Sequence, residues 1–191
     1  MVSKTPFSLL LDSWPTFCAN IDAFMEELGL TSHSLICDHV AIRVNQLSLA
    51  NQLKTHVHEY GKIISENMIN GRPILIIKLN QSLQLNHLII DYLELPFPSH
   101  KRYPIEGWEH IELVFPSHAK DCQTLSHELQ QAIPTLAPVI ANQTAIQVKM
   151  SSPKGEKERL ANPTIAFKKN NVCIKIHPHH IHTIISSESE A

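Results

Sequence analysis

The sequence predicts an α+β fold, in which two βαβββ modules form a curved mixed sheet around a concave cleft, with an N-terminal helical extension. Residues 36–44 and 107–115 share one pattern: in each, an acid precedes a histidine and alternating apolar residues follow. The two histidines, His39 and His110, lie 71 residues apart, which is too long for a solenoid unit and suits a small duplicated module. A similar order of helical and strand patterns follows each stretch, so we expect both modules to form one structural domain.

The chain begins with helical periodicity. Apolar residues recur three to four positions apart, and Gly29 ends the run. The stripe consists of Phe17, Ile21, Phe24, Met25 and Leu28. We expect residues 1–35 to form a helical extension that packs on the modules. The alternative is a scaffold in which this stripe stays exposed and docks a partner.

The first module is predicted over residues 36–98. Its elements are a strand over residues 38–44, a helix over 48–60, and strands over 62–67, 73–79 and 87–95. Gly61 ends the helix, and Asn70-Gly71 is a strong signal for a tight turn between two strands. Pro96 closes the last strand, since proline cannot donate to a sheet.

The second module is predicted over residues 99–191, and it begins in a linker rich in proline and basic residues. Its elements are a strand over residues 109–115, a helix over 119–133 with Ser117 as candidate cap, and strands over 144–150, 164–168 and 172–177. Residues 151–163 have no apolar rhythm, and their charges are mixed in sign. We therefore expect an exposed loop there, and no nucleic-acid patch.

Composition excludes several functional classes. The net charge of the 191 residues is −2, so no overall field favours nucleic acid or an anionic membrane. The apolar runs are far shorter than the roughly 18 residues of a membrane span. Residues 1–11 are not followed by the small-residue cleavage site of a signal peptide. The four widely spaced cysteines are expected to be buried free thiols of a cytoplasmic protein.

Successive residues of a strand point to opposite sides, which assigns an apolar and a polar face to each key strand. The polar faces carry His39 and Arg43 on the first strand, His110 and Glu112 on its repeat, and Lys175 and His177 on the last strand. We expect these faces to line a wet cleft, since buried charges need partners. Glu94 ends the strand over residues 87–95, where the sequence does not choose which face meets the cleft.

Two histidines and a carboxylate on neighbouring strands form a common ligand set for Zn, Fe, Ni or Mn. The predicted ligands of a divalent metal ion are His39, Glu94, His110 and His177. A metal ion that keeps an open position can polarise a substrate or activate water. Arg43, Glu112 and Lys175 are predicted to contact the substrate or support the ligands. The alternative for these three is a local salt network.

The acids that directly precede the two histidines are predicted to face away from the site. By strand parity, Asp38 and Glu109 point away from the rings of His39 and His110, so neither acid is expected to orient its neighbouring ring. Parity also places Cys37 on the same side as His39.

Five motifs carry a resemblance to a known family. They are residues 65–74 (SENMINGRPI), 94–96 (ELP), 101–104 (KRYP), 106–112 (EGWEHIE) and 151–156 (SSPKGE). In these motifs, and over nearly its whole length, the chain resembles the bacterial YecM proteins. The paired modules also resemble the vicinal oxygen chelate superfamily, which includes glyoxalase I, methylmalonyl-CoA epimerase, extradiol dioxygenases and bleomycin-resistance proteins.

The superfamily resemblance implies ligands from the first and last strands of each module. These positions are His39, Glu94, His110 and, nearest to the last, His177, where the superfamily often has Glu. The resemblance implies a metal-dependent enzyme that acts on a small oxygenated metabolite by isomerase, lyase or dioxygenase-like chemistry, with Glu112 as proton carrier or ligand. The alternative is a metal-free small-molecule-binding module. A monomer or a homodimer is expected.

Overall fold

The computed structural model describes residues 5–152 and 160–188 of the chain. Its strands are β1 (Ile36–Arg43), β2 (Gly61–Ile69), β3 (Arg72–Leu85), β4 (Leu88–Pro96), β5 (Gly107–Val114), β6 (Gln147–Ser151), β7 (Thr164–Lys169) and β8 (Val172–His177). Its helices are α1 (Pro6–Asp12), α2 (Trp14–Leu28), α3 (Leu47–Thr55), the 3-10 turn η1 (Val57–Glu59), α4 (Cys122–Ala132), α5 (Leu136–Ile140) and α6 (Ile181–Glu188). Among the described residues, no helix is both long enough and apolar enough to cross a membrane.

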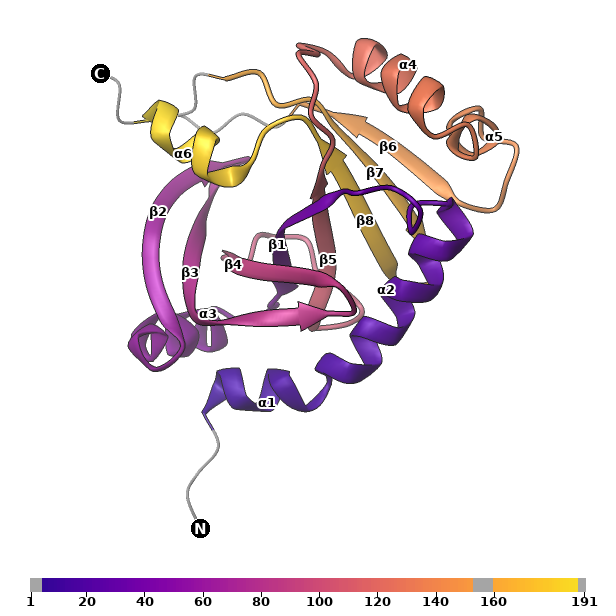
Figure 1. The fold of residues 1–191 in the computed structure, drawn as a ribbon. Coiled ribbons are helices and arrows are strands. Elements are labelled where there is room, and N and C mark those ends of the chain that lie inside the picture. Colours follow the sequence, from indigo (N-terminus) through magenta and orange to yellow (C-terminus); the bar gives the residue numbers. More distant parts are fainter. Residues whose placement is uncertain (1–4, 153–159, 189–191) are drawn as a thin grey trace.

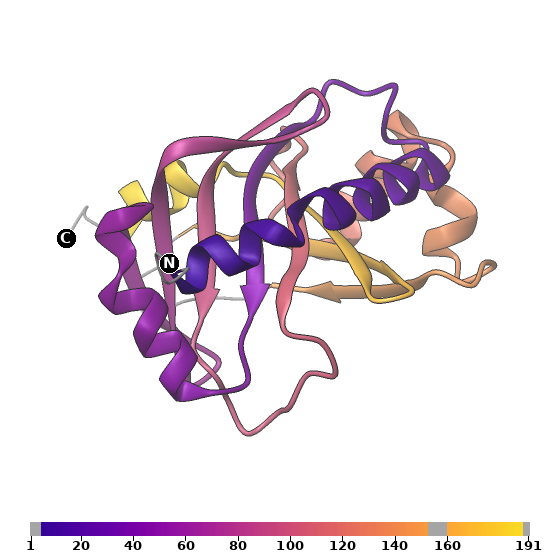
Figure 2. The ribbon, with the colours of Figure 1, turned by 90° about the horizontal axis from the view of Figure 1, so that it is seen from below.

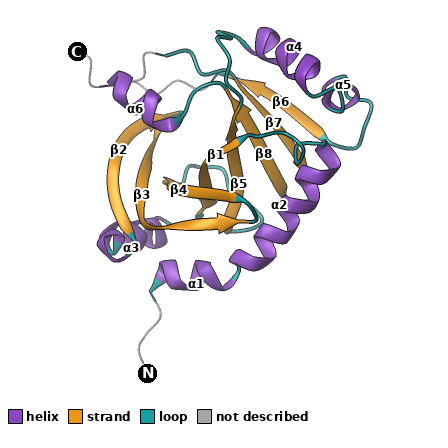
Figure 3. Cartoon of the chain, viewed as in Figure 1, coloured by secondary structure: helices purple, strands orange, loops and turns teal. Residues whose placement is uncertain are grey.

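The strands form one curved mixed sheet (Figure 1). Within the described residues eight strands pair in the order β2-β3-β4-β1-β5-β8-β7-β6, and the sheet stays open between β2 and β6. Helices α1 to α5 lie around the outside of the strands, whereas α6 packs on the opposite face of β3 and β4 (Figure 3). Figure 2 shows α1 and α2 crossing one face of the sheet. The α+β prediction is confirmed.

The two halves of the sheet have closely similar layouts. One half is β1, α3, β2, β3 and β4, and the other is β5, α4, β6, β7 and β8, with α5 inserted after α4. In each half the first strand is parallel to the last, and β1 and β5 pair antiparallel at the centre. Ala41, two residues after His39, pairs with Glu94. Glu112, two residues after His110, pairs with Lys175. Glu94 and Lys175 therefore hold equivalent positions in the two halves.

Several local features differ from the sequence prediction. Helices α5 and α6 are not anticipated, because each is too short to show several turns of apolar repeat, whereas α1 lies within the predicted helical extension. Strand β3 continues to Leu85, since pairing with β4 supports its exposed polar end. Asp121 caps α4 by accepting the N–H of Thr124 at 2.8 Å, in place of Ser117. Of the predicted N-terminal extension and exposed loop, residues 1–4 and 153–159 lie outside the described residues.

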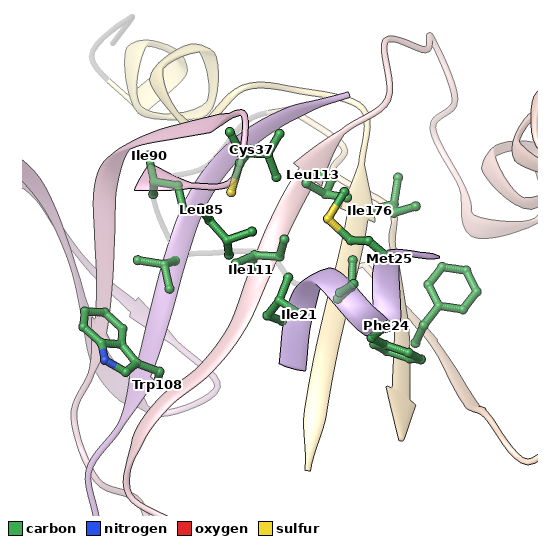
Figure 4. Packing of buried hydrophobic residues seen from close by; sticks show 14 of the residues in the cluster. Ile21, Phe24, Met25, Cys37, Leu85, Ile90, Trp108, Ile111, Leu113 and Ile176 are labelled. Atoms are coloured by element: carbon green, nitrogen blue, oxygen red, sulfur yellow. The ribbon is translucent and has the colours of Figure 1, made fainter. Parts of the chain in front are cut away.

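Helix α2 packs against the sheet by the predicted apolar stripe. Figure 4 shows Ile21 and Met25 of α2 directed at labelled side chains of β5 and β8. Ile21 is completely buried, and the other members of the stripe are buried with it in the main core. The alternative of an exposed stripe that docks a partner is therefore wrong, and α2 is part of the core.

Ile21→Val is expected to lower the free energy of unfolding by about 1 kcal/mol, because the variant loses a buried methylene at a packed site. Urea unfolding followed by circular dichroism measures this change. Ile89→Val is the matched control, since Ile89 is 65% exposed and its variant should stay within about 0.5 kcal/mol of the parent. Equal, small effects at both positions would contradict the packing role of α2.

The four cysteines are free, as expected. Cys37 and Cys173 are buried, whereas Cys18 and Cys122 are half-buried. Burial raises the pKa of the Cys173 thiol to about 12, so this thiol stays protonated at neutral pH.

Candidate metal centre

Strands β1 and β5 each contain a β-bulge directly before the histidine that the two modules share, His39 in β1 and His110 in β5. Leu113 and Glu112 of β5 pair with Cys37 and His39, which leaves Asp38 as the extra residue of β1. In the same way, Ile42 and Ala41 of β1 pair with Trp108 and His110, which leaves Glu109 as the extra residue of β5. The two extra residues hold equivalent positions in the repeat.

The bulges overturn the parity prediction for the two acids. A bulge adds one residue without an opposing partner and re-aims the side chains around it. As a result, Asp38 lies beside the ring of His39, and Glu109 lies beside the ring of His110. Cys37 moves to the opposite side, into the main core (Figure 4). Strict alternation fails here because it assumes an uninterrupted ladder.

Each histidine thus has one ring nitrogen held by the acid before it. Nδ1 of His39 lies 3.0 Å from Oδ2 of Asp38, and Nδ1 of His110 hydrogen-bonds to the carboxylate of Glu109. The ring centroids of the two histidines are 6.3 Å apart. A carboxylate on one nitrogen fixes ring orientation and leaves the other nitrogen for a ligand, as is common around protein-bound metals.

The free sides of the rings meet two carboxylates. Nε2 of His110 lies 3.1 Å from Oε1 of Glu112, and Nε2 of His39 lies 3.5 Å from the same oxygen. Nε2 of His39 is also 3.8 Å from Oε2 of Glu94. One potential ligand atom from each of these four residues lies within 4.8 Å of the other three. We call His39, Glu94, His110 and Glu112 the central cluster.

The central cluster is buried rather than spread along a wet cleft. His39 and His110 are 2% and 0% exposed, whereas the side chain of Glu94 keeps 15% of its surface accessible. Nε2 of His39 is buried and has no hydrogen-bond partner among the described residues. A buried, unpartnered imidazole nitrogen is costly, and a bound cation would satisfy it.

Electrostatics keep the carboxylates of the central cluster ionised. Burial by itself would raise the pKa of Glu112, but Lys175 and His39 hold this pKa well below its ordinary value. Burial also opposes ionisation of Glu94, whose pKa is nevertheless lowered by Lys175 and His110. For His39, burial alone would lower the pKa, yet Glu112 and Asp38 raise it to about 10. Without a metal ion, His39 is therefore protonated at neutral pH.

The predicted supporting residues adjoin the central cluster. Nζ of Lys175 donates to Oε1 of Glu112 at 2.6 Å. The guanidinium of Arg43 reaches Oε1 of Glu94 at 3.7 Å and Oε2 of Glu109 at 3.4 Å. Of the three residues predicted to contact substrate, Glu112 is thus inside the cluster and the other two lie at its edge.

His177 lies beside the central cluster and is not a member of it. Its Nε2 is 3.4 Å from Oδ2 of Asp38 and 3.8 Å from Oε2 of Glu112. Strand register makes Lys175, and not His177, the equivalent of Glu94. Lys175 and His177 share a face of β8, so parity alone could not separate them. Asp38 and Glu109 are the residues that sequence reasoning missed, and no sequence signal marks their bulges.

A separate hollow of about 730 Å³ lies between α1, α3 and the start of β5. It is lined by apolar side chains, including Leu10, Val44 and Leu53, and by as many polar ones, but by no member of the central cluster. The central cluster and this hollow therefore lie in different parts of the molecule.

The fold and the central cluster define a class: a duplicated α+β protein whose halves together bury a group of histidines and carboxylates. Residues 7–188 match the family model described as YecM protein. The chain belongs to the YecM family, which confirms the family named from its motifs.

Relatives match over most of their length. Protein YecM of Escherichia coli (strain K12) is 42% identical over 177 residues, covering 93% of this chain and 91% of the relative. An uncharacterized protein of Haemophilus influenzae (strain ATCC 51907 / DSM 11121 / KW20 / Rd) is 38% identical over 170 residues, covering 86% of each. A solved structure described as "Structural Genomics, Protein EC4020" superposes with a TM-score of 0.81 at 36% identity, covering 96% of this chain and 93% of the other.

Proposed function

We propose that this protein is a metal-dependent enzyme of the vicinal oxygen chelate type, with His39, Glu94, His110 and Glu112 as ligands of one divalent cation. Its substrate would be a small oxygenated metabolite, converted by isomerase, lyase or dioxygenase-like chemistry. The observation that carries the proposal is the central cluster, four ligand atoms within 4.8 Å of one another, together with the buried Nε2 of His39, which no described residue hydrogen-bonds.

The charges of the site fit a divalent cation. Four carboxylates meet here, from Glu94, Glu112 and the two bulge acids, and two fixed cations, Arg43 and Lys175, oppose them. Four negative charges less two positive charges leave two negative charges. One divalent ion with neutral imidazoles balances them, and two imidazole nitrogens with two carboxylate oxygens suit Zn, Fe, Ni or Mn.

The chain's own residues would bind and orient the substrate. A bound divalent ion would supply Lewis-acid polarisation of a substrate oxygen. Glu94 and Lys175 retain 15% and 23% of their side-chain surface, so a substrate would approach from their side of the cluster. The ammonium of Lys175 can donate a hydrogen bond to an oxygen that gains negative charge.

Metal analysis of untagged protein tests the proposal. We expect about one equivalent of a divalent metal in purified protein, or one saturable site when metal-stripped protein is titrated with Zn²⁺, Ni²⁺, Mn²⁺ or Fe²⁺ in a calorimeter. Protein that contains no metal and shows no saturable binding of any of the four ions would refute it.

One observation favours a second candidate, a metal-free small-molecule-binding module. Lys175 holds the position equivalent to Glu94 and places its ammonium 2.6 Å from Glu112, so the chain already supplies one cation to the cluster. The same titration separates the two candidates, because this module would bind none of the four metal ions.

The affinity for a divalent cation is expected to rise with pH. In the metal-free chain the pKa of His39 is raised to about 10, so a cation must displace this proton. Because higher pH removes the competing proton, the apparent association constant should rise up to about tenfold per pH unit between pH 6 and 8. The pKa values of Glu94 and Glu112 are lowered, so these carboxylates add no titration in that range.

Competition against a metallochromic chelator at pH 6, 7 and 8 measures this slope, after correction for the chelator's own protonation. Calorimetry in two buffers of different ionisation enthalpy checks it independently, since about one proton should leave per ion bound. An association constant that stays flat across this range would contradict the protonated state of His39.

The remaining expectations are a cytoplasmic location and a monomer or homodimer. Both stay predictions, and cell fractionation and native mass spectrometry would test them.

A further inference from the structure

Asp38 joins the central cluster to the C-terminal helix. Its Oδ2 lies 3.0 Å from Nδ1 of His39 and 3.4 Å from Nε2 of His177. Its Oδ1 accepts the backbone N–H of Ile181, the first residue of α6, at 2.8 Å and lies 3.3 Å from Nδ1 of His180. The carboxylate is 0% exposed. One buried side chain therefore holds a candidate ligand with one oxygen and a helix with the other.

Helix α6 covers an apolar patch next to the central cluster. Ile181 and Ile185 pack against the small core formed by Ile74, Ile76 and Tyr92. Tyr92 and Glu94 lie on the same face of β4, two residues apart, and Ile76 pairs with Glu94 across the ladder. The surface beneath α6 is thus continuous with the position of Glu94.

We propose that Asp38 is a positioning residue that couples cation binding in the central cluster to the docking of α6. The coupling rests on the proposed function, because it requires a cation. A cation on Nε2 of His39 would fix the ring and its Nδ1–H bond to Asp38, and the fixed carboxylate would hold the first turn of α6. Binding and docking therefore favour each other, and the effect must be reciprocal.

Glu109 supplies a comparison within the molecule. It occupies the equivalent bulge and bonds to His110 as Asp38 bonds to His39. Its further partner is Arg43, and among the described residues none of its hydrogen bonds or ion pairs is to α6. Loss of Glu109 should weaken cation binding without releasing α6, whereas loss of Asp38 should do both.

Hydrogen exchange of the α6 amides, measured by mass spectrometry with and without a saturating divalent ion, tests the coupling. In the parent protein the ion should slow exchange of α6 about fivefold or more. Asp38→Asn should abolish this response, because His39 and Ile181 each donate to a different carboxylate oxygen and the amide puts a donating NH2 group in place of one of them. Glu109→Gln should lower affinity by about 10–100-fold yet keep the response at saturation. Unchanged exchange in α2 shows that each variant is folded.

A variant remote from the ligand atoms tests reciprocity. Ile185→Ala weakens the packing of α6 and should lower cation affinity, by no more than the factor by which the ion slows exchange of α6. Ile140→Ala on α5 is the matched control and should bind as the parent does. Cation binding that leaves the exchange of α6 unchanged would overturn the coupling alone. Absence of any cation binding would overturn the proposed function, and the coupling with it.

Discussion

Replacing both His39 and His110 with alanine is expected to abolish cation binding. Sites with four protein ligands bind zinc with about 10–16 kcal/mol. Losing two of the four ligands should therefore cost about 5–8 kcal/mol, roughly a 10⁴-fold or greater loss of affinity. Metal content by mass spectrometry should fall below one tenth of an equivalent, and the calorimetric signal should disappear.

His87→Ala with His127→Ala is the matched control for this experiment, since both side chains are exposed and neither belongs to the central cluster. The control should retain full metal content. Retention of metal by the His39→Ala, His110→Ala variant would place the cation elsewhere, with the histidines that follow Pro178 as the next candidates.

Lys175→Gln is expected to lower the stability of the metal-free protein and to raise its affinity for a divalent cation. Removing one partner of a buried ion pair costs about 3–5 kcal/mol, and the 23% exposure of the Lys175 side chain favours about 3 kcal/mol for the metal-free protein. If a cation takes the place of this ammonium beside Glu112, the metal-bound variant does not lose this stability. Cation affinity should then rise by the same free energy, roughly 100-fold. Urea unfolding of metal-free protein and calorimetric titration measure the two effects.

Lys169→Gln provides the control, because Lys169 pairs with Glu27 at 2.6 Å on an exposed surface. Such pairs contribute about 0–1 kcal/mol, so stability and cation affinity should both stay close to the parent. A Lys175→Gln variant that loses stability without gaining affinity would instead support the metal-free binding module, in which the ammonium is the resident cation.

Much of the fold follows from periodicity in the sequence. The pattern shared by residues 36–44 and 107–115, an acid, a histidine and alternating apolar residues, predicts two equivalent strands, and pairing of β1 with β5 joins them at the centre of the sheet. Alternation also places His39, His110 and Glu112 on one side, where the structure brings their side chains together. These features are local or repeated, so one sequence is enough to show them.

The features that could not be predicted from the sequence depend on pairing between distant strands. A bulge is a property of two strands and their register, so nothing within 36–44 marks Asp38 as an extra residue. Parity limits His177 and Lys175 to one face, whereas the pairing of Glu112 with Lys175 decides which one is equivalent to Glu94. Helix α6 depends on Asp38, 143 residues away, for its first hydrogen bond.

The matched bulges also bear on the ancestry of the chain. One inserted residue before each histidine is explained by a single event that preceded doubling of the segment, whereas separate origins need two events at the same place. The ancestral half would already have held an acid against its imidazole. Two copies of such a half-length polypeptide, meeting along the edge that is now the junction of β1 and β5, would bring two of these pairs together before any fusion of the genes.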